Sequence, residues 1–92
     1  MPVKVCELRH IQSLPQLYEA MAAQLPLPTH FGRNLDALYD VLANDVVGPF
    51  EIIWRDTEAS RQALGADTYA TVLEILQTVA EERGDVTLDI HH

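Results

Sequence analysis

Cysteine, basic side chains and long apolar runs are all scarce in this 92-residue chain. Its one cysteine, Cys6, cannot form an intramolecular disulfide, so the sequence predicts a protein of the reducing cytoplasm. Six basic residues stand against 14 acidic ones, which leaves a net charge of −8. This balance argues against direct nucleic-acid binding, because that binding needs basic residues to neutralise phosphates. The acidity suits a basic protein partner instead.

Membrane, secretion and cofactor signals are missing as well. No apolar run approaches the ~20 residues that span a bilayer, and the first residues lack the basic end and apolar stretch of a signal peptide. Glycine-rich phosphate loops and zinc-ligand spacings are also absent. We therefore expect a cytoplasmic protein with no membrane contact, no cofactor and no metal. A flexible tail or tag remnant is a simpler interpretation of His91 and His92 than a metal site.

The chain does have enough apolar residues, 48%, to form one domain over residues 1–92. Alternation of apolar and polar residues predicts strands at 3–8, 50–54 and 85–90, with Val3 and Val5 sharing one face of the first. Cys6 is expected to be a small packed residue of that strand. Helical spacing predicts a helix over residues 14–25 capped by Ser13, one over 35–43, a short one capped by Thr57 and ended by Gly65, and one from Thr68 to Gly84.

The order strand, helices, strand, helices, strand predicts an α/β fold with a parallel three-stranded sheet. Alternation in all three strands indicates that only one face of the sheet is buried. If both crossovers step the same way, the strand order is 1-2-3. The sequence therefore predicts two layers, with every helix packed on one face of the sheet.

One helix carries an acidic face. Asn34 is a good N-cap, because its side-chain oxygen can accept from a free N–H of the first turn. The apolar residues of this helix face a core (Leu35, Leu38, Val41 and Leu42). Asp36, Tyr39 and Asp40 share the opposite side. Asp36 gains from the helix dipole, but Asp40 lies too far along and repels Asp36. Such a surface is either simply solvated or made for a cationic partner.

Residues 31–40 read Phe-Gly-Arg-Asn-Leu-Asp-Ala-Leu-Tyr-Asp. This segment resembles the barstar-like family of ribonuclease inhibitors, whose inhibitory helix follows the pattern aromatic-Gly-x-Asn-Leu-Asp-Ala-Leu-Trp-Asp. The likeness continues in order at residues 25–28, at Gly48-Pro49, at the strand ending in Trp54-Arg55 and at residues 85–87. It implies the same two-layer fold, a cis Gly48–Pro49 bond, and a monomer that plugs the active site of a small, basic, barnase-like ribonuclease with helix 35–43.

The resemblance also implies roles for single residues. Asp40 would take a substrate phosphate position among basic catalytic groups, and Asp36 would pair with an arginine of the enzyme. Tyr39 would supply aromatic contact area where the family has tryptophan, and Gly32 would allow close backbone approach. The expected partner-binding residues are His30, Gly32, Asn34, Leu35, Asp36, Tyr39, Asp40, Asn44, Asp45, Val46, Thr78 and Glu82.

Three positions depart from the family pattern. His30 replaces a tyrosine, the pair Asn44-Asp45 replaces Gly-Trp, and Thr78 replaces a glutamate that pairs with the enzyme. Acidic residues four positions to either side, Glu74 and Glu82, share a helix face with Thr78, and either could take over its role. These departures predict that the cognate ribonuclease differs from barnase, or that binding to barnase itself is weaker.

Two other functions are compatible with parts of this sequence. Paired carboxylates can serve as acid and base in an enzyme, but Asp36 and Asp40 lie on a convex helix without a nucleophile or buried base, so we expect no enzyme. The second alternative is an acidic interaction module of the same fold that binds another basic protein and no ribonuclease.

Overall fold

The computed structural model describes residues 3–29 and 31–91. Its centre is a parallel sheet of three strands, β1 (Lys4–Leu8), β2 (Phe50–Trp54) and β3 (Val86–Ile90), in the order β1-β2-β3. The register places Cys6 beside Ile52, and Ile52 beside Leu88. The predicted α/β sheet with order 1-2-3 is therefore confirmed.

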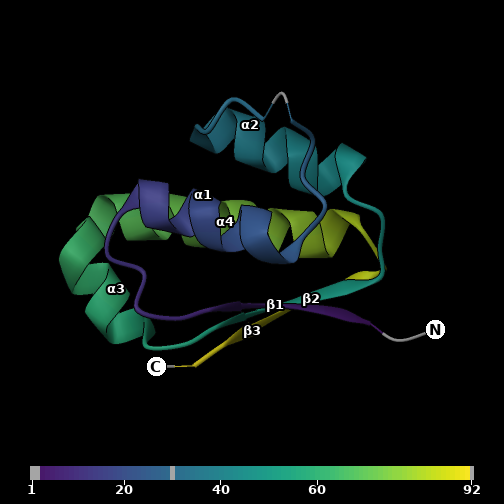
Figure 1. Ribbon diagram of the computed structural model, residues 1–92. Helices are drawn as coiled ribbons and strands as arrows, with labels where there is room; N and C mark the ends of the chain where they lie inside the picture. Colours follow the sequence, from purple (N-terminus) through teal and green to yellow (C-terminus); the bar gives the residue numbers. More distant parts are fainter. Residues whose placement is uncertain (1–2, 30, 92) are drawn as a thin grey trace.

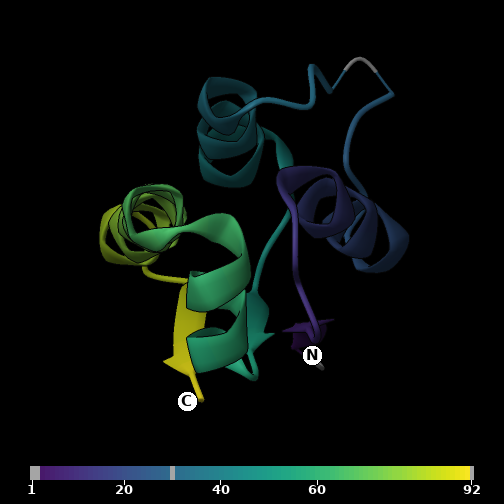
Figure 2. The same cartoon turned by 90° about the vertical axis from the view of Figure 1, so that its left-hand side faces the viewer.

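The helices all cover one face of this sheet, as Figures 1 and 2 show. Contacts to the sheet come from α1 (Leu14–Gln24) on β1 and from α4 (Ala66–Glu82) on β3. The short α3 (Thr57–Leu64) precedes α4. The helix α2 (Leu35–Asp40) lies farther from the sheet, above α1 and α4, and continues into a π-helical turn, η1 (Val41–Asp45). None of the helices in the described ranges lies on the opposite face of the sheet.

The core lies between the sheet and the helices. Burial alternates along β2, whose inward side chains are those of Phe50, Ile52 and Trp54. Fully buried residues of α1 and α4 meet them from the helix layer (Leu17, Met21, Val72, Leu76 and Val79). A fully buried Leu side chain contributes about 1.5–3 kcal/mol relative to exposure. The helix α2 lies above this core, on the side of α1 and α4 that faces away from the sheet.

Val3 and Val5 share one face of the first strand, as predicted, and that face is the exposed one. Val3 and Val5 are 50% and 48% exposed, whereas Cys6 and Leu8 are fully buried. The sheet decides this, because the register puts Cys6 beside the inward-facing Ile52, and a strand alternates its side chains strictly. Burial raises the pKa of the Cys6 thiol to about 12, so Cys6 is a packing residue, as expected.

Several boundaries also differ from prediction. Thr57 does not cap α3; it is the first helical residue, and its hydroxyl donates to the carbonyl of His91 at 3.3 Å, while Asp56 stands at the N-cap with φ 57°. Gly65 ends α3 with φ 92°, as predicted. The next helix begins at Ala66 rather than Thr68. The Gly48–Pro49 bond is cis, which agrees with the expectation.

Candidate protein-binding surface

The start of α2 is anchored by its cap and by its buried side. The side-chain oxygen of Asn34 accepts from the Ala37 N–H at 2.8 Å, with Asn34 in an extended conformation. On the inner side, Leu38 is fully buried. The predicted N-cap and the predicted core face are therefore confirmed, and they determine which side of the helix faces solvent.

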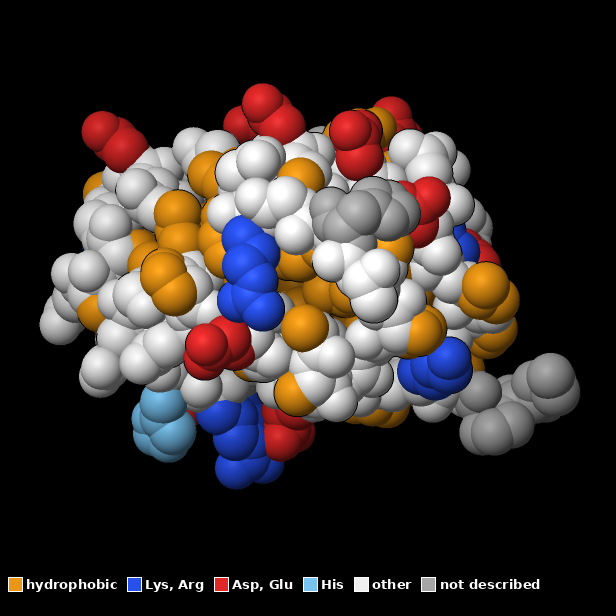
Figure 3. Space-filling view, turned by 45° about the horizontal axis from the view of Figure 1, so that its top comes forward, with side chains coloured by type: hydrophobic (Ala, Val, Ile, Leu, Met, Phe, Trp, Pro, Cys, Tyr) orange, Lys and Arg blue, Asp and Glu red, His pale blue; other side chains and the backbone are white. Residues whose placement is uncertain are grey.

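The outer side of α2 presents two unpaired carboxylates. Asp36 and Asp40 are both exposed, and neither forms an ion pair with any described residue. Figure 3 shows the face that contains this region, with acidic side chains gathered in its upper part and hydrophobic side chains lining a hollow below them. Charges left unpaired in this way are available to a partner.

Tyr39 lies between these aspartates but is less free than the sequence suggested. Its ring is half-buried, and its hydroxyl donates a hydrogen bond to the Glu82 carboxylate on α4. This hydrogen bond, followed by burial and the negative charges of Glu82 and Asp40, raises the pKa of Tyr39 above its ordinary value. The bond brings Glu82, which follows Tyr39 by 43 positions in the sequence, to the edge of the acidic face.

The end of the acidic helix corrects the predicted range 35–43. The α-helix ends at Asp40, and the chain continues as the π-helix η1 to Asp45, closed by the Val46 N–H donating to the Val41 carbonyl at 3.0 Å. Asn44 and Asp45 are exposed on this turn. The Val46 side chain is only 2% exposed, so it packs in the core rather than facing solvent. π-turns of this kind occur often at functional sites.

Arg83 stabilises the end of η1, and sequence reasoning missed it. One nitrogen, Nη1, donates to the carbonyls of Leu42 and Val46 at 2.8 and 2.7 Å. The other two nitrogens form a fork on Asp85, at 3.0 and 2.9 Å, and the guanidinium lies 5.2 Å from the centre of the Phe50 ring. Carbonyls at a helix end lack intrahelical partners, and a cation there satisfies them. The close Arg-x-Asp spacing was the available signal.

The remaining predicted residues differ in exposure. Thr78 is half-buried on α4, and Glu74 is exposed without a described partner. Gly32 is exposed next to the cap, where an added Cβ would lie 3.3 Å from the side-chain nitrogen of Asn34. Leu35 is half-buried. His30 lies outside the described residues.

The described residues contain neither a metal-binding cluster nor a membrane-spanning helix. Within residues 3–29 and 31–91, no three His, Cys, Asp or Glu side chains come together in a way that could hold a metal ion. None of the helices in the same ranges has the length and apolar character needed to cross a membrane.

Comparisons with known proteins agree with this arrangement. The family model described as "Barstar (barnase inhibitor)" matches residues 1–91. A protein of Bacillus subtilis (strain 168) named "Putative ribonuclease inhibitor YrdF" is 36% identical over 78 residues, which cover 84% of each chain.

Proposed function

This chain belongs to the Barstar family, and we propose on that basis that it inhibits a small basic ribonuclease by covering its active site with α2 and η1. Membership of the family, together with the name of the similar protein, supports a ribonuclease-inhibitor-like role. The identity of the target and the way in which it is blocked are our proposals.

The observation that carries the proposal is that the carboxylates of Asp36 and Asp40 are exposed and form no ion pair with any described residue, on a helix held by its N-cap and its buried inner side. A ribonuclease must gather basic groups where it binds the phosphates of RNA, and those groups would meet the two carboxylates. Charge-assisted hydrogen bonds to arginine are the stronger kind, and become stronger when water is excluded. In this arrangement Asp40 takes the place of a phosphate, and Asp36 pairs with a neighbouring arginine.

Two further groups support the same face. Tyr39 adds rigid aromatic area, and its bond to Glu82 holds it in place. Because Glu82 is drawn to the edge of the face, we assign to Glu82, rather than Glu74, the role that the family glutamate has at the position of Thr78. At the other end of the face, η1 presents Asn44 and Asp45.

A panel of small ribonucleases tests the proposal. The purified protein is used to capture each enzyme, and RNA cleavage is then followed with increasing inhibitor. We expect stoichiometric inhibition of at least one basic enzyme, loss of inhibition in Asp40→Ala, and little change in Asp89→Ala. Asp89 is a suitable control because it is an exposed aspartate on β3 and loses the same charge. Capture without loss of RNA cleavage would favour the alternative, a module that binds a basic protein away from any active site.

A further inference from the structure

An open groove of about 600 Å³ lies beside the acidic face, between the first turns of α1 and α2. Its apolar lining comes from Leu14, Pro15, Tyr18 and Leu35, and its polar lining from Arg33, Asn34 and Asp36. Three of these residues, Asn34, Leu35 and Asp36, belong to the proposed ribonuclease-binding surface. The groove and the acidic face are therefore continuous.

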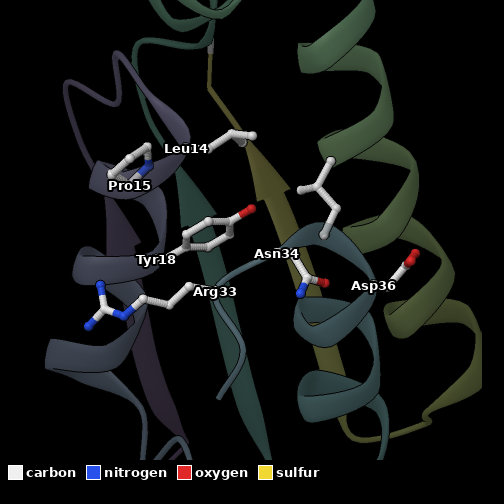
Figure 4. A pocket seen from close by; sticks show the side chains of 7 residues that line it. Leu14, Pro15, Tyr18, Arg33, Asn34 and Asp36 are labelled. Atoms are coloured by element: carbon white, nitrogen blue, oxygen red, sulfur yellow. The ribbon is translucent and has the colours of Figure 1, made fainter. Parts of the chain in front are cut away.

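Tyr18 contributes its hydroxyl to the groove. The residue is only 5% exposed, and its ring is held by an edge-on contact with Phe31, with the ring centres 5.6 Å apart. Figure 4 shows the hydroxyl directed into the groove, on the side of α2. It forms no hydrogen bond with any described residue. The hydroxyl is not among the buried polar atoms that lack a partner, so it is open to solvent in the groove and can bind a group from outside.

Arg33 contributes an unpaired cation to the same groove. Four of the arginines form ion pairs, namely Arg9, Arg55, Arg61 and Arg83. Arg33 forms none with the described residues, although the chain has an excess of acidic groups. Its backbone has φ 50°, and its side chain extends toward α1 while Asp36 points the other way. An arginine stays charged and presents a planar set of donors suited to a carboxylate.

We propose that this groove is a second contact surface for the same ribonuclease, and that it receives a surface segment in which a carboxylate lies beside an apolar side chain. The carboxylate pairs with Arg33, the apolar side chain lies on Leu14 and Leu35, and the Tyr18 hydroxyl binds a polar atom of the segment. The inference rests on the proposed function. A stable protein interface buries about 800 Å² on each partner, and the groove is the surface that adjoins the start of α2.

Matched charge reversals test the groove in a binding assay with the ribonuclease that the wild-type protein inhibits. Arg33→Glu should weaken the affinity about ten- to a hundredfold, the range for a lost hydrogen bond to a charged group. Arg61→Glu changes the net charge by the same amount as Arg33→Glu, but at an exposed site on α3. It should weaken the affinity less than about fivefold. Tyr18→Phe removes only the hydroxyl, which has no described partner within the fold, and should weaken the affinity about two- to tenfold.

A second arm identifies the carboxylate. Acidic surface residues of the ribonuclease are replaced singly by lysine, and one replacement should restore binding to Arg33→Glu. Three results would each overturn the proposal that the groove contacts the ribonuclease. They are equal effects of Arg33→Glu and Arg61→Glu, an unchanged affinity for Tyr18→Phe, and failure of every lysine replacement to restore binding. In those cases Asp40→Ala would still weaken binding if the proposed function holds. If no ribonuclease binds the wild-type protein, the proposed function fails, and the groove inference fails with it.

Discussion

The hydroxyl of Tyr39 on α2 donates a hydrogen bond to the carboxylate of Glu82 on α4. This bond joins the acidic helix to the long helix beneath it, and it satisfies the polar end of a ring that is otherwise packed against the core. The aromatic part of the proposed binding surface is thus held before any partner arrives. Such preorganisation reduces the entropy cost of binding.

The Tyr39–Glu82 bond should be visible in the titration of the tyrosine. The bond raises the pKa of Tyr39, so replacing Glu82 by glutamine should move that pKa back toward the ordinary value of about 10. Tyr39 titration can be followed by NMR of ring carbons. Unchanged titration in Glu82→Gln would mean that the bond does not form in solution.

The same shift predicts how stability depends on pH. A proton held more tightly in the folded state stabilises it at every pH below the pKa of the unfolded tyrosine, about 10. This contribution is lost as the pH rises through the raised folded pKa of Tyr39. The gap in urea midpoint between the wild-type protein and Tyr39→Phe should therefore be constant near neutral pH and narrow in strong alkali. A gap that widened in alkali would contradict the assignment.

Asp40→Ala should be the most damaging single change for inhibition, followed by Asp36→Ala and Tyr39→Ala. Removal of Asp40 leaves basic groups of the enzyme desolvated without a partner. Fold stability should stay constant or rise by a few tenths of a kcal/mol, because the repulsion between Asp36 and Asp40 disappears. Inhibition constants and urea unfolding of the same variants check both parts. An unfolded Asp40→Ala protein would show that the residue is structural.

Association with the cognate ribonuclease should be fast at low salt and should slow as salt is added. Opposite charges on the two proteins steer their encounter, and the screening length falls from about 10 Å at 0.1 M salt to about 3 Å at 1 M. Stopped-flow association rates measure this dependence. The double variant Asp36→Asn, Asp40→Asn should show a flatter salt dependence. A wild-type association rate independent of salt would argue against electrostatic steering.

Gly48→Ala should destabilise the protein through the Arg83–Asp85 pair. A Cβ at Gly48 would lie 2.7 Å from the carboxylate carbon of Asp85 and 2.8 Å from Nη2 of Arg83, so the pair would have to open. Arg83 in turn holds the end of η1 through its bonds to the carbonyls of Leu42 and Val46. Gly84→Ala is the matched control, since nothing lies within 4 Å of its added Cβ.

A cycle with Asp85→Ala checks the mechanism at Gly48. In the Asp85→Ala background, Gly48→Ala should cost less stability than it does in the wild-type background. The carboxylate that the added Cβ would meet is then absent. Equal costs in the two backgrounds would show that the alanine disturbs something other than this pair. Urea unfolding of the four proteins supplies the comparison.

Much of the fold was predictable because it rests on short-range patterns. Alternation located β2 and its three buried side chains, and helical spacing located α1 and α4. The cap at Asn34 and the separation of Leu38 from Asp36 and Asp40 also follow from neighbours within four positions. Such features depend on local geometry that every helix or strand shares. The family resemblance added the cis bond at Gly48–Pro49.

The tertiary structure determined the contacts between residues that lie far apart in the sequence. Only the pairing of β1 with β2 shows that Cys6 and Leu8, rather than Val3 and Val5, face the core, since both sets alternate equally well. The bond from Tyr39 to Glu82, and the bonds from Arg83 to the end of η1, join residues about 40 positions apart. The groove at Tyr18 exists only because α2 packs beside α1. By itself the sequence determined which side chains carry charge and which elements they belong to. The packing of those elements determined which charges are paired within the fold and which stay free for a partner.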